Sequence, residues 1–178
     1  MRVIAIDAGV ANIGVAVMEL VSGSWDSWRP AELLLIQTEA DPRKGRIRAA
    51  DSDMERVKEA MRQMGEVIER HDIKRMAVEL PVAGGQSAAA VKFMALASAI
   101  CAHAEVRYNL FTEWYSPGEC KKCVAGRWTS SKTLVANAIE AKYRAVVEQF
   151  PACEQREHVV DALACFETAL RLGNVCRP

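Results

Sequence analysis

Several features that would define a protein class are missing from this sequence of 178 residues. No uninterrupted apolar run reaches about 18 residues, which argues against a membrane span. The chain contains no internal repeat and no low-complexity tract. Its first strand-like run carries only Arg2 as a basic residue and does not resemble a signal peptide. Since 51% of the residues are apolar, the composition argues against disorder. We therefore expect a single domain over residues 1–178 of a cytoplasmic protein.

The cysteines indicate neither a disulfide framework nor a zinc site. All six fall in a chain that we expect to be cytoplasmic, where thiols stay reduced. Cys120 and Cys123 have the C-x-x-C spacing of half a zinc site, but no second pair completes it. The chain also lacks the βαβ setting of a thioredoxin-type redox motif around this pair. The sequence therefore predicts ordinary reduced cysteines.

Neither sign of charge is in excess, because the chain has 23 basic and 23 acidic residues. A zero net charge is unusual for a protein that binds nucleic acid, whose affinity rests on cationic contacts to phosphate. The distribution is uneven, however. Acidic residues concentrate in 51–72, whereas residues 43–48 (RKGRIR) are basic. A second basic cluster precedes the last third of the chain and consists of Lys121, Lys122, Arg127 and Lys132. This pattern is compatible with a basic face and an acidic back.

Apolar periodicity predicts an alternation of strands and helices typical of an α/β protein. Strands are expected at 2–7, 13–20, 32–38, 73–80 and 105–114. Helices are expected at 53–70, 87–104, 116–124, 130–149 and 155–171. Asp51, Ser52 or Asp53 is suited to cap the first helix, and Ser130 or Ser131 to cap the fourth. Residues 22–32 and 81–86 are predicted loops, 39–53 a charged linker, and the tail GNVCRP is expected to fray.

Chemistry-bearing side chains recur where these elements end. Asp7 closes the apolar strand RVIAID, and Glu79 lies at the end of the apolar strand RMAVEL (75–80). His158 and Asp161 stand three residues apart in a predicted helix, so they share one face. A carboxylate beside so apolar a strand is costly to desolvate unless it holds a cation or a hydrogen bond. Carboxylates suit magnesium or manganese, and an imidazole is compatible with manganese. Each residue alone would fit a turn, a strand end or a polar helix face, but together they favour a metal-dependent nuclease or a phosphate-handling enzyme.

The order of these motifs resembles the RuvC family of Holliday junction resolvases, whose fold is RNase H-like. The resemblance runs nearly end to end. It rests on IDAGVANIGVAV (6–17), AVELP (77–81), SAAAVKFMALASAI (87–100), SPGECKKCVAG (116–126), SSKTLVANAI (130–139) and HVVDALA (158–164). It implies one RNase H-like nuclease domain over 1–178, with a mixed β-sheet of five strands flanked by helices.

The resemblance also implies a set of site residues. Asp7, Glu79, His158 and Asp161 fall on the metal-binding positions of the family, where both Asp and His occur at the position of His158. Lys121 and Lys132 fall on its two basic positions near the scissile phosphate, and a slip of one residue would exchange Lys121 for Lys122. Trp128 lies between these two positions and is the aromatic that we expect at DNA. The residues predicted to contact DNA are Lys121, Lys122, Arg127, Trp128, Lys132, Arg43, Lys44, Arg46 and Arg48.

The function implied is a metal-dependent, structure-selective DNA endonuclease that resolves four-way junctions by paired cuts and leaves 5′-phosphate ends. Two Mg²⁺ or Mn²⁺ ions per site are implied. The helix at 87–104, rich in alanine, corresponds to the dimer interface of the family, so a homodimer is expected with branched DNA as its partner. No membrane partner is expected. The implied location is the cytoplasm of a bacterium or of a phage-infected host.

Other functions fit parts of the sequence. A broader branched-DNA or flap endonuclease is favoured by the neutral charge and by the stretch 80–83 (LPVA), where the family often has an aromatic. An actin-like or sugar-kinase-like ATPase also opens with strand-Asp-x-Gly, but would need a second glycine-rich phosphate loop and a larger, two-domain chain. A junction-binding protein without catalysis is disfavoured by the full acid set. An RNA-processing relative of the same fold stays open.

Overall fold

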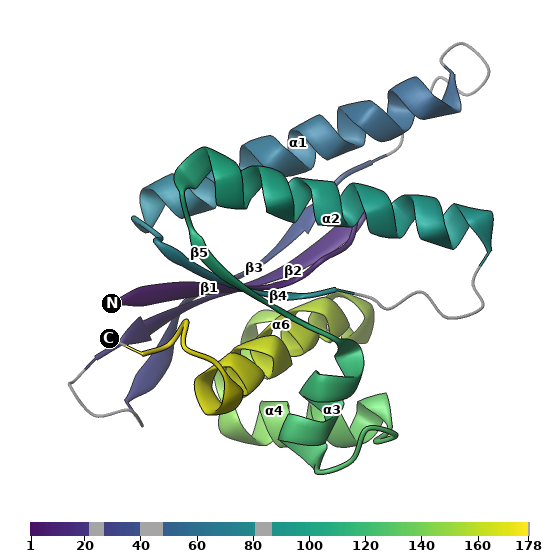
Figure 1. Ribbon diagram of the computed structural model, residues 1–178. Coiled ribbons are helices and arrows are strands. Elements are labelled where there is room, and N and C mark those ends of the chain that lie inside the picture. The colour runs from purple at the N-terminus through teal and green to yellow at the C-terminus, as the bar shows by residue number, and fades with distance from the viewer. Residues whose placement is uncertain (22–26, 40–47, 81–86, 178) are drawn as a thin grey trace.

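The computed structural model describes residues 1–21, 27–39, 48–80, 87–152 and 154–177 in full, and the backbone alone at residue 153. Within these residues the chain forms one five-stranded sheet with helices on both faces (Figure 1). The elements are β1 (Arg2–Asp7), β2 (Asn12–Leu20), β3 (Trp28–Gln37), α1 (Ala49–Arg70), β4 (Arg75–Glu79), α2 (Ala88–Tyr108), β5 (Phe111–Tyr115), α3 (Pro117–Ala125), α4 (Lys132–Lys142), α5 (Arg144–Gln149) and α6 (Cys153–Leu172).

The sheet is mixed, with strand order β3-β2-β1-β4-β5. β2 pairs antiparallel with both β1 and β3, whereas β1 pairs parallel with β4 and β4 with β5. The central position of β1 explains its apolar sequence, because both of its faces are covered. This arrangement confirms the predicted α/β fold, an RNase H-like mixed sheet of five strands flanked by helices.

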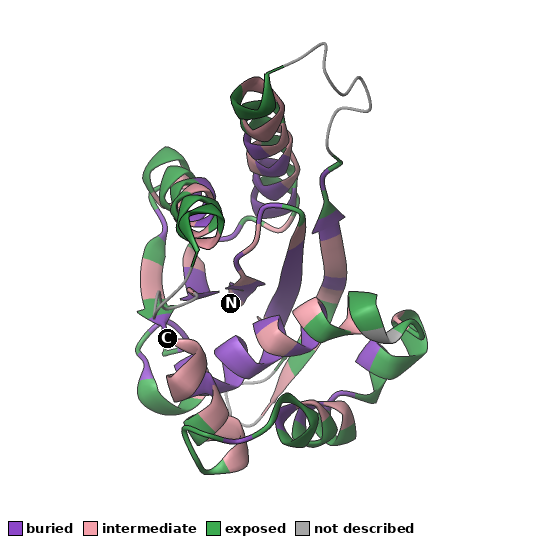
Figure 2. Cartoon of the chain, turned by 90° about the vertical axis from the view of Figure 1, so that its right-hand side faces the viewer, coloured by how far each residue is buried: buried purple, intermediate pink, exposed green. Residues whose placement is uncertain are grey.

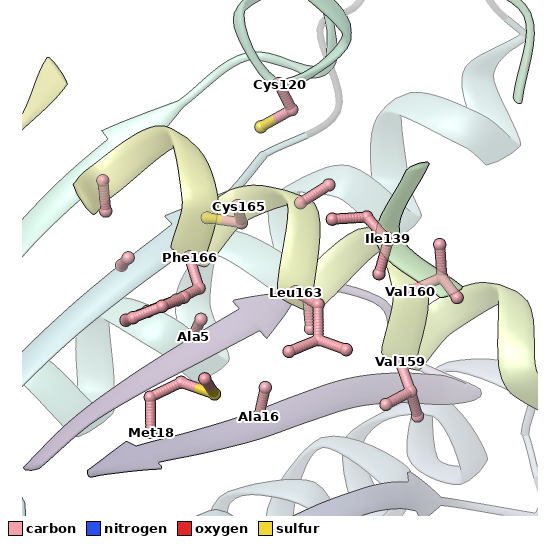
Figure 3. Close-up of a cluster of buried hydrophobic side chains, with 14 of the residues drawn as sticks. Ala5, Ala16, Met18, Cys120, Ile139, Val159, Val160, Leu163, Cys165 and Phe166 are labelled. Carbon is pink, nitrogen blue, oxygen red and sulfur yellow. The ribbon is translucent and has the colours of Figure 1, made fainter. Parts of the chain in front are cut away.

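Two apolar clusters hold the layers together. One joins the sheet to α1 and α2 and includes Ile4, Ile6 and Ile100. The other joins the opposite face of the sheet to α6, α3 and α4 (Figure 3). In Figure 3, Leu163 and Phe166 of α6 lie over Ala5, Ala16 and Met18 of the strands. Figure 2 shows the same division, with buried residues on the sheet and on the inner helix faces.

A glycine sets how closely α6 approaches the sheet. Gly14 of β2 pairs with Asp7 of β1, and a Cβ built on Gly14 would lie 1.9 Å from the carbonyl oxygen of His158. That contact is with backbone, which cannot move aside as a flexible side chain can. The missing side chain therefore lets α6 lie directly over the end of β1, and His158 is carried to that point.

The first edge strand is longer than predicted. β3 begins at Trp28, inside the predicted loop 22–32, and Pro30 is accommodated because β3 is the edge of the sheet. A register shift between Val17 and Met18 falls opposite this proline. Trp28 packs edge-on against Phe166, with ring centroids 5.4 Å apart, so this tryptophan serves the core.

The predicted strand at 105–114 is wrong in its first half. α2 continues to Tyr108, ends at Asn109 in the left-handed conformation, and leaves only Phe111–Tyr115 as β5. The alternation of residues 105–114 suits a strand, but Glu105 and Tyr108 continue the helix on the side of Cys101 and Ala104, and Tyr108 packs against the cluster under α1 and α2. His103, predicted at a helix end, therefore lies inside α2.

The predicted helix at 130–149 is broken at Tyr143 into α4 and α5. Lys142 donates to Glu167 of α6 at 2.6 Å, and the Tyr143 hydroxyl donates to the same carboxylate. Glu167 is only 2% exposed, so this buried charge requires both partners. Ser131 caps α4 as predicted, whereas α1 begins after Arg48 rather than at Asp51, Ser52 or Asp53.

The C-terminal tail, predicted to fray, is held in place instead. Val175 is fully buried and Cys176 is 1% exposed. Glu113 of β5 accepts hydrogen bonds from the backbone N–H groups of Asn174 and Val175, at 2.8 and 3.1 Å. Arg75 of β4 donates to the carbonyl oxygen of Val175 at 3.2 Å. The expectation from position in the chain was wrong because these two charged side chains satisfy the tail backbone.

Helix α2 has two opposite faces of different character. Its inner face packs against α1 and the sheet through Ala97, Ile100, Cys101 and Ala104. Its outer face is exposed and apolar, and consists of Val91, Ala95, Ala99, Ala102 and Val106. By length and composition alone α2 would suffice to cross a membrane. In this fold it is a layer helix with one uncovered apolar stripe.

The contact at Gly14 generates a prediction about stability. We expect Gly14→Ala to lower the free energy of unfolding by about 1–3 kcal/mol or more, because the new methyl group meets backbone. Gly118→Ala is the matched control, since the nearest atoms there belong to the exposed ring of Trp128, which can turn away. Urea unfolding of both variants measures the difference. Equal, small costs at the two positions would contradict the close approach of α6.

Candidate active site

A cavity of about 270 Å³ opens at the carboxyl ends of β1 and β4. It is lined by Asp7, Ala8, Gly9, Glu79, Pro117, Cys120, Lys121, Lys132, Val135, His158, Asp161 and Ala164. All six residues predicted to take part in catalysis belong to this lining, although they come from five different elements of the chain. The structure therefore brings the predicted site residues together.

Strand alternation directs Asp7 into this cavity. Val3 and Ala5 belong to the cluster under α6, whereas Ile4 and Ile6 belong to the cluster under α1 and α2. Successive side chains of a strand point to opposite faces of the sheet. Asp7 therefore follows Val3 and Ala5 and faces α6.

Glu79 reaches the same place by the same rule. Ala77 lies in the cluster under α6 and Val78 in the other, so Glu79 also faces α6. The parallel register pairs Asp7 with Glu79, which places the two strand ends side by side. Glu79 is 9% exposed. Burial raises its pKa to about 10, and Cys120, Asp161 and Asp7 add to this increase.

Helix α6 supplies the other two predicted ligands. His158 Nδ1 lies 2.8 Å from Asp7 Oδ2, and this hydrogen bond is the main reason why the pKa of His158 is raised. Asp161 follows one turn later. Burial and then the charge of Asp7 raise the pKa of Asp161 to about 6, against the opposing effect of Lys132.

The two predicted lysines approach from α3 and α4. Lys132 forms an ion pair with Glu157, and its Nζ lies 3.9 Å from Asp161 Oδ2. The hydrogen bond to Glu157 raises the pKa of Lys132, so its ammonium group stays charged. Lys121 lines the cavity, whereas the Nζ of Lys122 lies 5.4 Å from the centroid of the Trp128 ring. The structure thus separates the two adjacent lysines.

The remaining residues predicted to contact DNA are more scattered. Arg127 and Trp128 are exposed in the turn after α3, and Trp128 keeps 52% of its surface. Arg48 is paired with Asp51 at 2.7 Å and does not line the cavity. Three of the predicted residues, Arg43, Lys44 and Arg46, lie outside the described residues. So do Pro81, Val82 and Ala83, where the family aromatic is absent from the sequence.

Sequence reasoning missed two residues of the site. Cys120 of α3 lines the cavity and is among the groups that raise the pKa of Glu79. Glu157 precedes His158 on α6 and holds Lys132. The C-x-x-C spacing of Cys120 and Cys123 gives no sign of this position, because the acids near Cys120 lie on other elements of the chain.

The donor set fits a hard divalent cation. Three carboxylates and one imidazole share the cavity, which is the ligand chemistry of magnesium or manganese. Among the described residues, no three His, Cys, Asp or Glu side chains are yet arranged around one ion, and Asp7 instead bonds His158. A cation would exchange this hydrogen bond for coordination. It would also relieve the repulsion that raises the pKa values of Glu79 and Asp161.

Because the pKa of Asp161 is raised, we predict that replacing this carboxylate by a neutral side chain stabilises the fold above the pKa and has little effect below it. The folded protein binds this proton more tightly than the unfolded chain, so metal-free stability falls as pH rises from about 4 through about 6. The Asp161 side chain is 21% exposed. We expect Asp161→Asn to raise the unfolding free energy in EDTA by about 2–3 kcal/mol at pH 8, and to change little at pH 3.5.

Thermal unfolding over this pH range measures the effect. Glu154→Gln is the matched control, because Glu154 is exposed in the first turn of the same helix. This control should leave stability unchanged or slightly lower, since the helix dipole favours a carboxylate there. A loss of stability in Asp161→Asn at pH 8 would contradict the strained acid cluster.

Comparisons with known proteins agree with this geometry. The sequence matches the family of the crossover junction endodeoxyribonuclease RuvC over residues 3–168. A search of curated proteins found no match. The structure of Thermus thermophilus RuvC is 21% identical, with a TM-score of 0.70 over 94% of this chain and 92% of that one.

Two solved complexes also share the fold. Thermus thermophilus RuvC in complex with Holliday junction substrate is 23% identical, with a TM-score of 0.71 over 94% of this chain and 92% of that one. The fowlpox virus resolvase with Holliday junction DNA is 10% identical, with a TM-score of 0.55 over 96% of this chain and 99% of that one. The family match over residues 3–168 confirms the resemblance seen in the motifs: this chain belongs to the RuvC family of crossover junction endodeoxyribonucleases.

Proposed function

We propose that this protein cleaves four-way DNA junctions with two Mg²⁺ or Mn²⁺ ions held by Asp7, Glu79, His158 and Asp161. The observation that carries the proposal is the single cavity at the end of β1 and β4, into which three carboxylates and one imidazole converge. As a RuvC family member the protein is a divalent-metal-dependent endonuclease that resolves Holliday junctions. The choice of metal, the number of ions and the ligand set are the proposal.

The acids are assigned the task of holding the cations. When bound, divalent ions supply a water acidic enough to attack phosphorus and positive charge for the phosphate oxygens. Glu79 must give up its proton for this task, because burial and then the neighbouring acids raise its pKa. His158 bonds Asp7 at 2.8 Å and so fixes the direction of that carboxylate.

The lysines are assigned the task of balancing phosphate charge. Lys121 and Lys132 line the cavity on the α3 and α4 side, opposite the strand that supplies Asp7. The Lys132 side chain is 65% exposed and is restrained by Glu157 alone at short range. Its ion pair with Glu157, a half-exposed carboxylate, can be exchanged for a phosphate oxygen at small cost, while its place 3.9 Å from Asp161 keeps it beside the acids. Hydrolysis in which the 3′ oxygen leaves the phosphorus would give a 5′-phosphate end, as the family implies.

A homodimer through α2 forms a further part of this proposal. The outer stripe of α2 (Val91, Ala95, Ala99, Ala102 and Val106) is apolar and exposed, and its small residues permit close approach of a second helix. A two-fold dimer would present two sites to opposing strands, which matches the symmetry of a four-way junction. Because both apolar clusters pack on one sheet, we also assign residues 1–178 to one nuclease domain. We further propose that this domain acts in the cytoplasm of a bacterium or of a phage-infected host, as the family implies.

The general test is cleavage of a synthetic four-way junction, a flap and a linear duplex side by side, first with Mg²⁺ and then with Mn²⁺. We expect paired cuts in the junction and no cuts in the duplex. Stronger cleavage of the flap than of the junction would favour the broader branched-DNA nuclease instead.

For the metal site we predict that Asp7→Asn abolishes junction cleavage while binding persists or tightens, because repulsion between acids and phosphate falls. Glu79→Gln and Asp161→Asn should behave alike. Single-turnover cleavage and gel-shift binding in Ca²⁺ measure the two effects. The control is Asp72→Asn, an exposed turn aspartate with φ of 48° that Asn replaces without strain. Near-normal cleavage by Asp7→Asn would exclude the proposed ligand set.

For the lysines we predict a separation of chemistry from binding. Lys121→Ala and Lys132→Ala should lower the single-turnover rate at saturating junction and leave affinity nearly intact. Lys122→Ala and Arg127→Ala should weaken binding and reduce the salt slope by about 1 each. Glu157→Gln is the control for Lys132, because it frees the ammonium group without removing it. Wild-type rates with weaker binding in the first pair would reverse the assignment.

For assembly we predict that Ala95→Glu or Ala99→Glu yields a monomer that no longer makes paired cuts. Burying a carboxylate in an apolar helix pair is costly, whereas the folded monomer exposes both positions. Sedimentation at micromolar concentration measures the state. Ala50→Glu is the control, since Ala50 is exposed at the start of α1. A monomeric wild-type protein would refute the dimer.

A further inference from the structure

A second cavity, the side cavity, lies beside the active site and shares two residues with it. Its volume is about 300 Å³, and it is lined by Gly9, Val10, Ala11, Asn12, Arg56, Phe93 and His158. Gly9 and His158 also line the acid cavity, which is the active-site cavity that holds the three carboxylates. The two cavities are therefore neighbours, and at Gly9 no side chain stands between them.

The side cavity lies past the end of the sheet rather than on one of its faces. Its lining comes from α1 and α2, from α6, and from the turn that joins β1 to β2. Figure 1 shows α1 and α2 on one side of the strands and α6 on the other. A DNA strand with one phosphate at the end of β1 therefore has the side cavity within reach of its next nucleotide.

Arg56 is the basic residue of the side cavity, and it has no acidic partner among the described residues. The other basic residues of α1 all form ion pairs: Lys58 with Glu55, Arg62 with Glu59 and Glu66, and Arg70 with Glu32. Arg56 instead donates through Nε to the hydroxyl group of Thr38 at 3.2 Å, and Thr38 donates to the carbonyl oxygen of Val10 at 2.6 Å. These bonds hold the guanidinium group, while Nη1 and Nη2 keep no acceptor in the described part of the chain.

The rest of the polar lining also favours an anion. Gln37 Nε2 donates to Asn12 Oδ1 at 3.1 Å, which leaves the amide nitrogen of Asn12 as a donor. No carboxylate belongs to the described lining of the side cavity, unlike that of the acid cavity. A third cavity, on the α4 side of the acids, is lined by Glu140 and Glu157 and suits a phosphate less. A phosphate in the side cavity would meet N–H donors and no negative charge.

Phe93 adds an aromatic surface beside these donors. It lies in the second turn of α2 and keeps 38% of its surface exposed. Lys92 restrains this part of the helix, because its Nζ pairs with Asp53 of α1 at 2.5 Å and lies 4.8 Å from the centroid of the Phe93 ring. An exposed ring that is restrained in this way is suited to stack on a nucleobase, since every base has a flat π-face.

We propose that the side cavity binds the nucleotide next to the scissile phosphate, with its base on Phe93 and its own phosphate on Arg56 and Asn12. This inference rests on the function proposed above, because it takes the acid cavity as the place of the scissile phosphate. A cation, an amide donor and an aromatic ring in one small cavity are the contacts that single-stranded nucleic acid makes. Anchoring this neighbour limits how far the scissile phosphate can move from the acids.

The subsite would also contribute to the preference for branched DNA. A base must leave its stack before it can lie on Phe93, and unstacking costs least where base pairing is already disturbed. The branch point of a four-way junction offers such bases, whereas an intact linear duplex does not. The side cavity therefore selects the substrate through the cost of freeing one base.

The first experiment measures junction affinity in Ca²⁺ by fluorescence anisotropy over a series of NaCl concentrations. We expect Phe93→Leu to raise the Kd by about 5- to 20-fold with an unchanged salt slope, because a stacking contact is lost but no charge. Arg56→Gln should raise the Kd and reduce the salt slope by about 1, because one phosphate contact is lost.

Phe111→Leu and Arg62→Gln are the matched controls. Phe111 is an exposed phenylalanine on β5 that lines neither cavity, and Arg62 is an ion-paired arginine on the same helix as Arg56. Both controls should leave the affinity and the salt slope unchanged. If each variant behaved like its control, the proposal would be overturned.

The second experiment tests the contact in wild-type protein, so it does not depend on how a variant folds. 5-Iododeoxyuridine is placed in turn at each nucleotide around the branch point of a synthetic four-way junction, and the complex in Ca²⁺ is irradiated. Trypsin releases Phe93 in peptide 93–107 and Trp128, the other aromatic expected at DNA, in 128–132. We expect a crosslink to Phe93 from a nucleotide next to the cut, which is mapped in Mg²⁺. Crosslinks to other peptides alone would overturn the proposal.

The outcomes also separate the side cavity from the nuclease function. Normal junction cleavage, together with a wild-type Kd for Phe93→Leu and no crosslink in 93–107, refutes the subsite alone. A crosslink in 93–107 from a protein that cuts no junction in Mg²⁺ or Mn²⁺ refutes the proposed catalysis and supports the nucleotide contact.

Discussion

The gathering of three carboxylates at one desolvated edge of the sheet is the constraint on which the rest of the structure depends. Parallel pairing of β1 and β4 sets Asp7 beside Glu79, and α6 adds Asp161 to the same cavity. Removing ionised carboxylates from water is costly, and neighbouring like charges increase the cost. The raised pKa values of Glu79 and Asp161 report that cost directly.

The surrounding elements offset part of the cost of this acid cluster. His158 bonds Asp7, Lys132 stands near Asp161, and the two apolar layers fix the strands that carry the acids. The compensation is incomplete, since the pKa values of Glu79 and Asp161 stay raised although Lys132 lies 3.9 Å from Asp161. The uncompensated negative charge lowers the stability of the metal-free protein. The same charge favours the binding of divalent cations.

Much of the site was predictable because its residues stand at positions that local sequence patterns reveal, namely strand ends and one face of a helix. Asp7 and Glu79 end apolar strands, and His158 and Asp161 share a helix face by their spacing alone. The remaining features depend on contacts between distant segments. Tyr143 donates to Glu167 where the helix is broken, Arg75 and Glu113 hold the tail, and Cys120 of α3 joins the lining of the cavity. Residues 105–108 alternate as a strand would, yet they form the last turn of α2, where Tyr108 packs against the cluster under α1 and α2.

The hydrogen bond between Asp7 and His158 joins residues 151 positions apart in the chain. Closing so long a loop costs conformational entropy, which contacts between distant segments must offset. Helix α6 must therefore be docked on the sheet before this bond can form. Local opening of α6 would remove two of the four predicted ligands at once. With the proposed ligand set, the capacity to cut DNA would require that the first strand and the last helix have met.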